Sequence, residues 1–175
     1  MTDQAALNIR TFVPDDLDQV QKLFASGLME FAGGVEQEVR GYVDSSLKAD
    51  LADITGHYLS HLRSNFWVVE SRGPAVAIVG IVGIQSTDLS EEAELRRMSV
   101  SSSARRQGIG RSLLETTEDF CREKGYRRIC LSSVDILQPA LAMYLRFGYR
   151  TVKEEPYGGP AHRPITVHYL VKELY

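Results

Sequence analysis

The sequence has few of the features of a secreted, membrane-spanning or disulfide-linked protein. Only two of its 175 residues are cysteine, Cys121 and Cys130, and they do not form a C-x-x-C pair. We therefore expect no disulfide framework, and two buried structural thiols rather than a nucleophile. The N-terminus has no signal-peptide pattern, and no apolar run reaches the roughly eighteen residues that span a bilayer. These absences predict a cytoplasmic protein with no membrane partner.

The sequence also has no strong net charge, no repeats and no low-complexity segment. Its formal net charge is −3, so we expect no nucleic-acid partner. Hydrophobic residues make up 43% and charged residues 25%, as in an ordinary globular protein, and the length suits a single domain over residues 1–175. Asp50, Asp53, His57 and His61 share one face of a predicted helix at spacings compatible with metal ligands. The same spacing fits a polar helix face, and with no cysteine or further histidine nearby we expect no metal site.

Alternating strand-like and helical patterns predict one α/β domain. Strands are predicted over residues 7–12, 65–71, 76–86, 94–100, 128–132, 149–154 and 165–170. Helices are predicted over residues 14–33, 36–62, 110–124 and 139–147, with a Gly/Pro-rich loop over residues 156–164.

The segment 105–112 carries the clearest ligand signal, because it follows a predicted strand and opens an amphipathic helix. A helix N-terminus presents unpaired N–H groups and the positive end of the helix dipole, so it attracts phosphate. Glycine allows the backbone to approach a phosphate closely. Residues 95–130 contain nine Arg or Lys against four Asp or Glu, which suits a polyphosphate. We predict a pyrophosphate cradle built from Arg105, Arg106, Gln107, Gly108, Ile109, Gly110, Arg111 and Ser112.

Other readings of this glycine pattern are weaker. A dinucleotide fingerprint requires a third glycine, where this chain has Leu113, and a P-loop requires Lys followed by Ser or Thr. An ordinary basic loop stays open as an alternative on composition alone.

The strand before the cradle is irregular. The apolar residues Leu95, Met98 and Val100 are separated first by three positions and then by two, so strict alternation fails. This pattern predicts a β-bulge, which would free backbone N–H groups, although a plain edge irregularity is the alternative. We add Met98, Ser99 and Val100 to the predicted ligand-binding residues.

These residues resemble the signature of the GNAT (GCN5-related N-acetyltransferase) superfamily. Arg105, Gly108 and Gly110 match its Arg/Gln-x-x-Gly-x-Gly/Ala motif, and the segment 140–149 is similar to its late helix-and-strand motif. The resemblance implies acetyl-CoA as cosubstrate. It also implies a mixed, mostly antiparallel sheet of six to seven strands, splayed at the fourth strand and flanked by about four helices.

The same resemblance implies the catalytic roles. Glu94, eleven residues before Arg105, would be the general base, and Tyr144 the general acid that protonates the departing thiolate. Without the resemblance, a solvated strand glutamate and a core tyrosine would explain both residues. Many members carry a pantetheine-contacting Asn seven residues before the tyrosine. This chain has Leu137 there, and whether the adjacent Gln138 makes the contact is left open.

A narrower resemblance covers roughly residues 40–155. Residues 94–100 resemble N-acetylaspartate synthase, and five segments resemble the camello-like N-acetyltransferases: residues 42–43, 50–54, 58–60, 66–71 and 79–83. Those enzymes acetylate the α-amine of cysteine conjugates or of aspartate and carry a hydrophobic membrane hairpin. The corresponding residues 31–41 of this chain are too few for that hairpin.

The resemblance therefore implies acetyl transfer to a primary amine, the α-amine of a small amino-acid-like acceptor, by direct attack in a ternary complex. Arg97, with Arg96 as second choice, would bind an acceptor carboxylate, because arginine pairs with carboxylates through two donors. Two alternatives stay open, a protein N-terminal or lysine acetyltransferase and a non-catalytic acyl-CoA-binding module. A homodimer is also left open.

Overall fold

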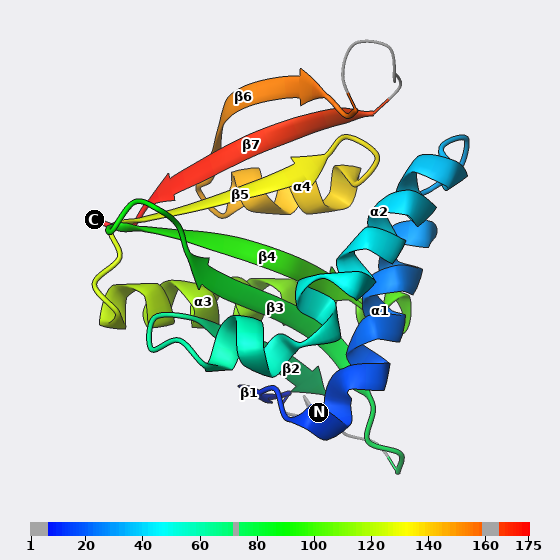
Figure 1. Cartoon of the computed structure of the whole chain (residues 1–175), viewed down its shortest axis with the longest axis horizontal. Coiled ribbons are helices and arrows are strands. Elements are labelled where there is room, and N and C mark those ends of the chain that lie inside the picture. Colours follow the sequence, from blue (N-terminus) through cyan, green and yellow to red (C-terminus); the bar gives the residue numbers. More distant parts are fainter. Residues whose placement is uncertain (1–6, 72–73, 159–164) are drawn as a thin grey trace, which may run out of the picture.

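Seven strands form one mixed sheet in the computed structural model, which describes residues 7–71, 74–158 and 165–175. The order across the sheet is β1-β2-β3-β4-β5-β7-β6 (Figure 1). The strands are β1 (Asn8–Thr11), β2 (Asn65–Glu70), β3 (Ile78–Ser86), β4 (Glu92–Val100), β5 (Arg128–Val134), β6 (Arg150–Pro156) and β7 (Thr166–Glu173). All neighbours are antiparallel except β4 and β5, so the predicted mixed, mostly antiparallel sheet is confirmed.

Helices cover both faces of this sheet. The side chains of α1 (Leu17–Met29) and α2 (Glu36–Lys48) pack in one apolar cluster, and those of α3 (Ile109–Glu123) and α4 (Gln138–Arg146) in another. Strand β2 supplies both clusters by its period of two, since Phe66 and Val68 face the first and Trp67 and Val69 the second. Strand β3 is buried from Ile78 to Ile84, as its long apolar run predicts.

The predicted helix over residues 36–62 is wrong beyond its first half. Helix α2 ends at Lys48, and Ala49 has φ −98° and ψ −122°, outside the helical region. A short 3-10 helix, η2 (Asp50–Ala52), and a π-helical turn, η3 (Thr55–Leu59), follow. Tertiary contacts of Asp50, described below, override the helical propensity of the segment.

This break also separates the four residues considered as metal ligands. Asp50 is buried, whereas the Asp53 carboxylate accepts a hydrogen bond from the Gly56 N–H at 2.8 Å, so the four do not share one helix face. Within the described parts of the chain, no three His, Cys, Asp or Glu residues are grouped so that they could hold a metal ion.

The predicted β-bulge is confirmed in β4. Gly83 pairs with Arg96 and Ile81 with Ser99, so Arg97 and Met98 together lie opposite Val82 alone. Arg97 has φ 58°, in the left-handed region that residues other than glycine rarely adopt.

The predicted splay at the fourth strand is also confirmed. Strands β4 and β5 pair only through residues 92–94 and 128–130, and β5 then continues against β7 alone. The two strands therefore diverge after Glu94, and the remaining length of β4 has no strand partner on its β5 side.

Both cysteine side chains are removed from solvent, Cys121 fully and Cys130 in part. Burial raises the pKa of each thiol to about 12, with nearby carboxylates adding to the shift, so both stay protonated at neutral pH. The thiol chemistry predicted from the sequence, structural rather than nucleophilic, agrees with this environment.

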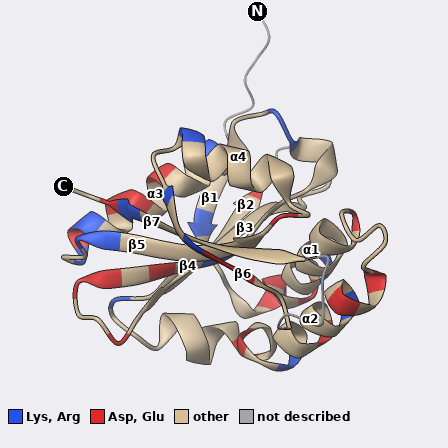
Figure 2. Cartoon of the chain, turned by 90° about the horizontal axis from the view of Figure 1, so that it is seen from above, with Lys and Arg blue, Asp and Glu red and all other residues tan. Residues whose placement is uncertain are grey.

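In Figure 2, both basic and acidic residues occur on the helices and on the strands of the described parts of the chain. Among the helices of the described residues, none is long and apolar enough to cross a membrane.

Candidate active site

A cavity of about 980 Å³ lies where β4 and β5 diverge. Its walls come from β4, β5, β7, the N-terminus of α3 and helices α1, α2 and α4, together with Tyr157 and Ile165. The splay thus creates the site, because regular pairing of β4 with β5 would close this space.

The N-terminus of α3 forms one end of the cavity. Gly108 stands at the N-cap position with φ 77°, a conformation that glycine adopts at little cost. No side chain of the described residues caps this helix, and its first helical hydrogen bond runs from the Ser112 N–H to the Gly108 carbonyl at 3.0 Å. A Cβ at Gly108 would meet no atom within 4 Å, so the backbone here faces open space. The amide groups of this first turn are available to an anion.

Gly110, two residues further along, faces Met143 of α4. A Cβ at this position would lie 2.7 Å from the Met143 sulfur, well inside contact distance. Arg106 also has a left-handed backbone, with φ 63°. Arg105 lines the cavity, but its guanidinium donates two hydrogen bonds to the Glu30 carboxylate, at 2.8 and 2.7 Å.

Most of the residues predicted to bind a cofactor line this end. They are Met98, Ser99, Val100, Arg105, Arg106, Gly108, Ile109, Gly110 and Arg111. Gln107, Ser112 and Gln138 are not among the lining residues. The Gln138 side chain donates to the Asp135 carbonyl at 2.6 Å, whereas its neighbour Leu137 does line the cavity.

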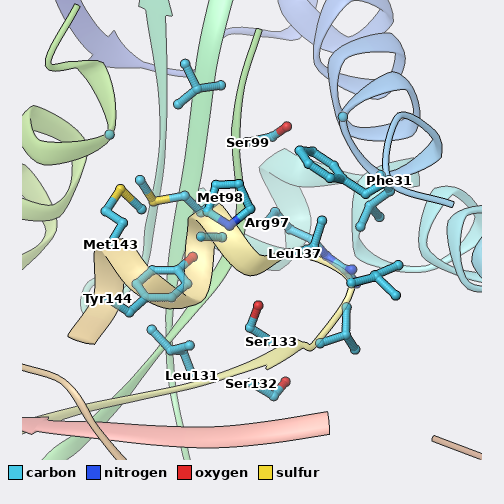
Figure 3. Close-up of a pocket in the computed structure, with 18 of the residues that line it drawn as sticks. Phe31, Arg97, Met98, Ser99, Leu131, Ser132, Ser133, Leu137, Met143 and Tyr144 are labelled. Atoms are coloured by element: carbon cyan, nitrogen blue, oxygen red, sulfur yellow. The ribbon is translucent and has the colours of Figure 1, made fainter. Parts of the chain in front are cut away.

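Glu94 and Tyr144 line the same cavity from its two sides. Glu94 is the last β4 residue paired with β5, opposite Cys130, and thus lies where the strands begin to part. Tyr144 comes from α4, packs edge-on against Tyr149 with ring centroids 5.7 Å apart, and is buried. Burial raises the pKa of Tyr144 well above its ordinary value, so its phenol stays protonated and can donate. Met98 and Met143 lie beside it (Figure 3).

The other end of the cavity is built from side chains, most of them apolar. Phe24 comes from α1, Phe31 from the turn that follows this helix, Val39 and Tyr42 from α2, and further apolar side chains from β7 and from α4 and the segment before it. Phe24 and Phe31 were not predicted to belong to a site. Their helical spacing, the only signal they give, is also the ordinary signal of core residues.

Arg96 and Arg97 add positive charge to this apolar end, in different settings. Arg97 is almost fully buried, with a side chain 5% exposed, and pairs with Asp50 through Nε at 3.0 Å and Nη2 at 2.6 Å. Its Nη1 donates to Tyr42 Oη and Ser46 Oγ, both at 2.9 Å. The Arg96 side chain is 30% exposed, donates to Gln85 at 2.7 Å and lies 3.8 Å from Asp50.

Asp50 is ionised in this network. Burial alone would raise its pKa, but hydrogen bonds from Arg97 and from the Tyr58 hydroxyl more than offset that effect and hold the pKa below its ordinary value. Burial, together with the negative charge of Asp50, raises the pKa of Tyr58, so its hydroxyl remains a donor.

Comparison with known sequences agrees with this geometry. A sequence model described as the Acetyltransferase (GNAT) family matches residues 34–149. N-acetyltransferase 8 of Rattus norvegicus is 37% identical over 119 residues, which are 67% of this chain and 54% of that protein. The probable N-acetyltransferase camello of Xenopus tropicalis is 35% identical over 123 residues, 70% of this chain and 55% of that protein. The chain thus spans about half the length of these curated relatives.

A solved structure shows the same fold at low sequence identity. The PaiA N-acetyltransferase of Thermoplasma acidophilum, in complex with coenzyme A, superposes with a TM-score of 0.77 at 17% identity. The match covers 96% of this chain and 99% of that one.

Proposed function

The chain belongs to the acetyltransferase (GNAT) family, and we propose that it transfers the acetyl group of acetyl-CoA to the α-amine of a small amino-acid-like acceptor. GNAT acetyltransferases use acetyl-CoA, and the relatives described above are named N-acetyltransferases. The observation that carries the proposal is the cavity, which joins an uncapped helix N-terminus to an apolar chamber containing arginine.

The residues at the α3 end fit coenzyme A. Open space in front of Gly108 and the uncapped first turn suit a pyrophosphate, and Arg106 and Arg111 add positive charge on the same wall. Arg105 contributes less free charge, because Glu30 already accepts two of its hydrogen bonds. When bound, acetyl-CoA supplies an activated acyl group as a thioester.

Two side chains would act as the general base and the general acid of the transfer. Glu94 takes a proton from the acceptor ammonium, so that the neutral amine can form the new C–N bond. Tyr144 gives its proton to the sulfur as the C–S bond breaks, which its raised pKa permits because the phenol is protonated at neutral pH. The nitrogen then releases its surplus proton to form the amide, and that proton, relayed by solvent, restores the Tyr144 phenol. Backbone N–H groups of the bulged strand would stabilise the charge that develops on the carbonyl oxygen.

The apolar end of the cavity supports a small acceptor with an apolar side chain and a free carboxylate. Phe24 and Val39 suit the side chain, and a guanidinium suits the carboxylate. We propose that Arg96, rather than Arg97, binds the acceptor carboxylate, which reverses the preference taken from the resemblance. The reason is that Arg97 already donates four hydrogen bonds to Asp50, Tyr42 and Ser46.

The test is thiol release from acetyl-CoA with a panel of free amino acids, S-substituted cysteines, polyamines and peptides, with the products identified by mass spectrometry. We expect α-N-acetylated amino acids with apolar side chains to form fastest. Preferred acetylation of peptides or of lysine side chains would instead make this a protein acetyltransferase. Coenzyme binding without turnover of any amine would make it a binding module.

A further inference from the structure

Two irregularities of the backbone, far apart in the sequence, meet at one buried ion pair. The first is the bulge in β4, where Arg97 has φ 58°. The second is the end of α2, where Ala49 leaves the helical region and Asp50 follows. The Asp50 and Arg97 side chains, 47 positions apart, meet through two hydrogen bonds of 3.0 and 2.6 Å.

The left-handed backbone of Arg97 needs an external cause. Residues with a Cβ are disfavoured in this region, and bulges of this kind usually place glycine there. Arg97 instead carries a side chain that is 5% exposed and fixed by Asp50, Tyr42 and Ser46. Its guanidinium also lies over the Phe24 ring, 5.2 Å from the ring centroid. Because strained residues persist only where surrounding contacts over-determine them, these contacts account for the conformation.

The same contacts leave Arg97 poorly suited to bind a ligand. A guanidinium has five N–H donors, and four hydrogen bonds to the protein are recorded for Arg97. A carboxylate ligand would need two parallel donors, which this side chain lacks without first releasing Asp50.

The bulge lies next to the residues that line the coenzyme end of the cavity. Met98 and Ser99 follow Arg97 directly, and both line the cavity on the length of β4 that no longer pairs with β5. A change in the Arg97 backbone would therefore rotate the N–H groups of the residues that follow it.

We propose that the Asp50–Arg97 ion pair is a positioning device, which holds the β4 bulge so that the backbone of Met98 and Ser99 is correctly aimed at the thioester. The inference rests on the proposed acetyl transfer. Arg97 acts through the main chain and does not contact the acceptor, and Asp50 serves through Arg97. Tyr58 completes the device by donating to Asp50 at 2.5 Å.

Replacement of Arg97 by alanine and by glycine separates this role from acceptor binding. Both variants lose the ion pair, but glycine adopts the left-handed conformation freely and alanine does not. We expect Arg97→Ala to lower kcat about 100-fold, since a small misplacement at a reacting centre has an effect of this size. Arg97→Gly should retain about tenfold more kcat than Arg97→Ala, which reflects the cost of the left-handed region for alanine. The acceptor KM should change less than about threefold in both, well below the loss expected for a charged hydrogen bond.

Two results would overturn the proposal. Equal kcat values for the alanine and glycine variants would mean that the backbone conformation is not what Arg97 maintains. An acceptor KM raised equally in both, with kcat retained, would mean that Arg97 binds the acceptor. At a regular strand position glycine is the less stable residue, so an advantage for glycine cannot come from general stability.

Asp16→Asn is the matched control for loss of a paired aspartate. Asp16 accepts two hydrogen bonds from Arg10, at 2.7 and 2.9 Å, and neither residue lines the cavity. We expect Asp16→Asn to lower the melting temperature and leave kcat unchanged, whereas Asp50→Asn should lower kcat as well. Equal kcat for Asp50→Asn and the unchanged protein would contradict the positioning role.

A readout without turnover keeps this test separate from the test of the function. Hydrogen exchange of the amides in residues 96–100 should be faster in Arg97→Ala than in Arg97→Gly, and coenzyme A should bind more weakly to the alanine variant. If no amine is acetylated by the unchanged protein, the proposed function fails, and these two measurements still decide whether the ion pair holds the bulge. Identical hydrogen-exchange rates and identical coenzyme A affinities in the alanine and glycine variants would show that the ion pair does not hold the bulge. If Arg97→Ala does not fold while Arg97→Gly does, the need for a left-handed backbone at position 97 is shown directly. If neither variant folds, the hydrogen-exchange rates and the coenzyme A affinity of Asp50→Asn decide the question.

Discussion

The two ends of the cavity are built from different parts of the chain. The coenzyme end consists largely of main chain, namely the first turn of α3 after Gly108 and the bulged strand at Met98. The acceptor end consists of side chains from α1, α2 and the segments around α4 and β7. Main chain at a helix N-terminus can bind only a narrow class of ligand, whereas side-chain walls can be changed one residue at a time. The main-chain end therefore indicates the cosubstrate, whereas the acceptor that binds at the side-chain end has to be found by experiment.

The largest effect should come from Glu94, which lines the cavity where β4 and β5 begin to part. Glu94→Gln removes the proposed base while keeping the size of the side chain, so we expect kcat/KM to fall about 10²–10⁴-fold. Equilibrium binding of coenzyme A, measured by calorimetry, should be unchanged. If kcat/KM of the Glu94→Gln variant equals that of the unchanged protein across the pH range, a group other than Glu94 is the general base.

The next effect should be confined to the coenzyme end. Gly108 has φ 77°, so Gly108→Val places a branched side chain in a disfavoured conformation in front of the proposed phosphate. We expect coenzyme A affinity to fall roughly 10–100-fold, with the acceptor KM unchanged at saturating acetyl-CoA. Gly41→Ala in α2 is the control, because a Cβ there meets no atom within 4 Å. Equal affinity in the Gly108→Val variant would show that the coenzyme does not approach this turn.

A smaller effect should be confined to the acceptor end. Arg96→Ala removes the more exposed guanidinium, so the acceptor KM should rise about 10–100-fold, the value of a charged hydrogen bond. The acetyl-CoA KM should stay constant. Arg96→Lys keeps the charge and loses the two-donor geometry, so an intermediate KM is expected. A normal acceptor KM in Arg96→Ala would remove carboxylate recognition from this residue.

The smallest expected effect concerns stability in acid. The pKa of Asp50 is held below its ordinary value, so its ion pair stabilises the fold above the unfolded pKa, about 3.9. That contribution is lost as the pH falls through the lower pKa of the folded state. The difference in melting temperature between the unchanged protein and Asp50→Asn should therefore narrow as the pH drops below about 4. A constant difference at all pH values would mean that Asp50 is not charged in the folded protein.

Local sequence patterns indicated the main-chain part of the cavity wall and four of its side chains, Glu94, Arg96, Arg97 and Tyr144, but not the apolar side chains opposite them. A bulge and a phosphate-binding turn require particular residues at neighbouring positions, so the apolar gap before Met98 and the glycines at 108 and 110 were enough to indicate them. Phe24 and Phe31 were indistinguishable from core residues until α1 was placed beside the splayed strands.

The ion pair of Asp50 and Arg97 had no local signal either. The two residues are 47 positions apart, and nothing in the spacing of either segment predicts that they meet. The helix end at Ala49 was missed for the same reason, since the apolar spacing of the segment favours a continuing helix whereas Asp50 is paired with a residue far away in the sequence. Contacts of this kind depend on the assembled fold.

The most direct test of the account compares one acceptor with and without its carboxylate. Initial rates of thiol release from acetyl-CoA would be measured for phenylalanine, phenylalanine amide and phenethylamine, which share the ring and the amine. The account predicts that phenylalanine is acetylated with a kcat/KM at least about tenfold above the other two, and that Arg96→Ala abolishes this preference. Equal or faster acetylation of phenethylamine would contradict an acceptor end built for the α-amine of an amino acid.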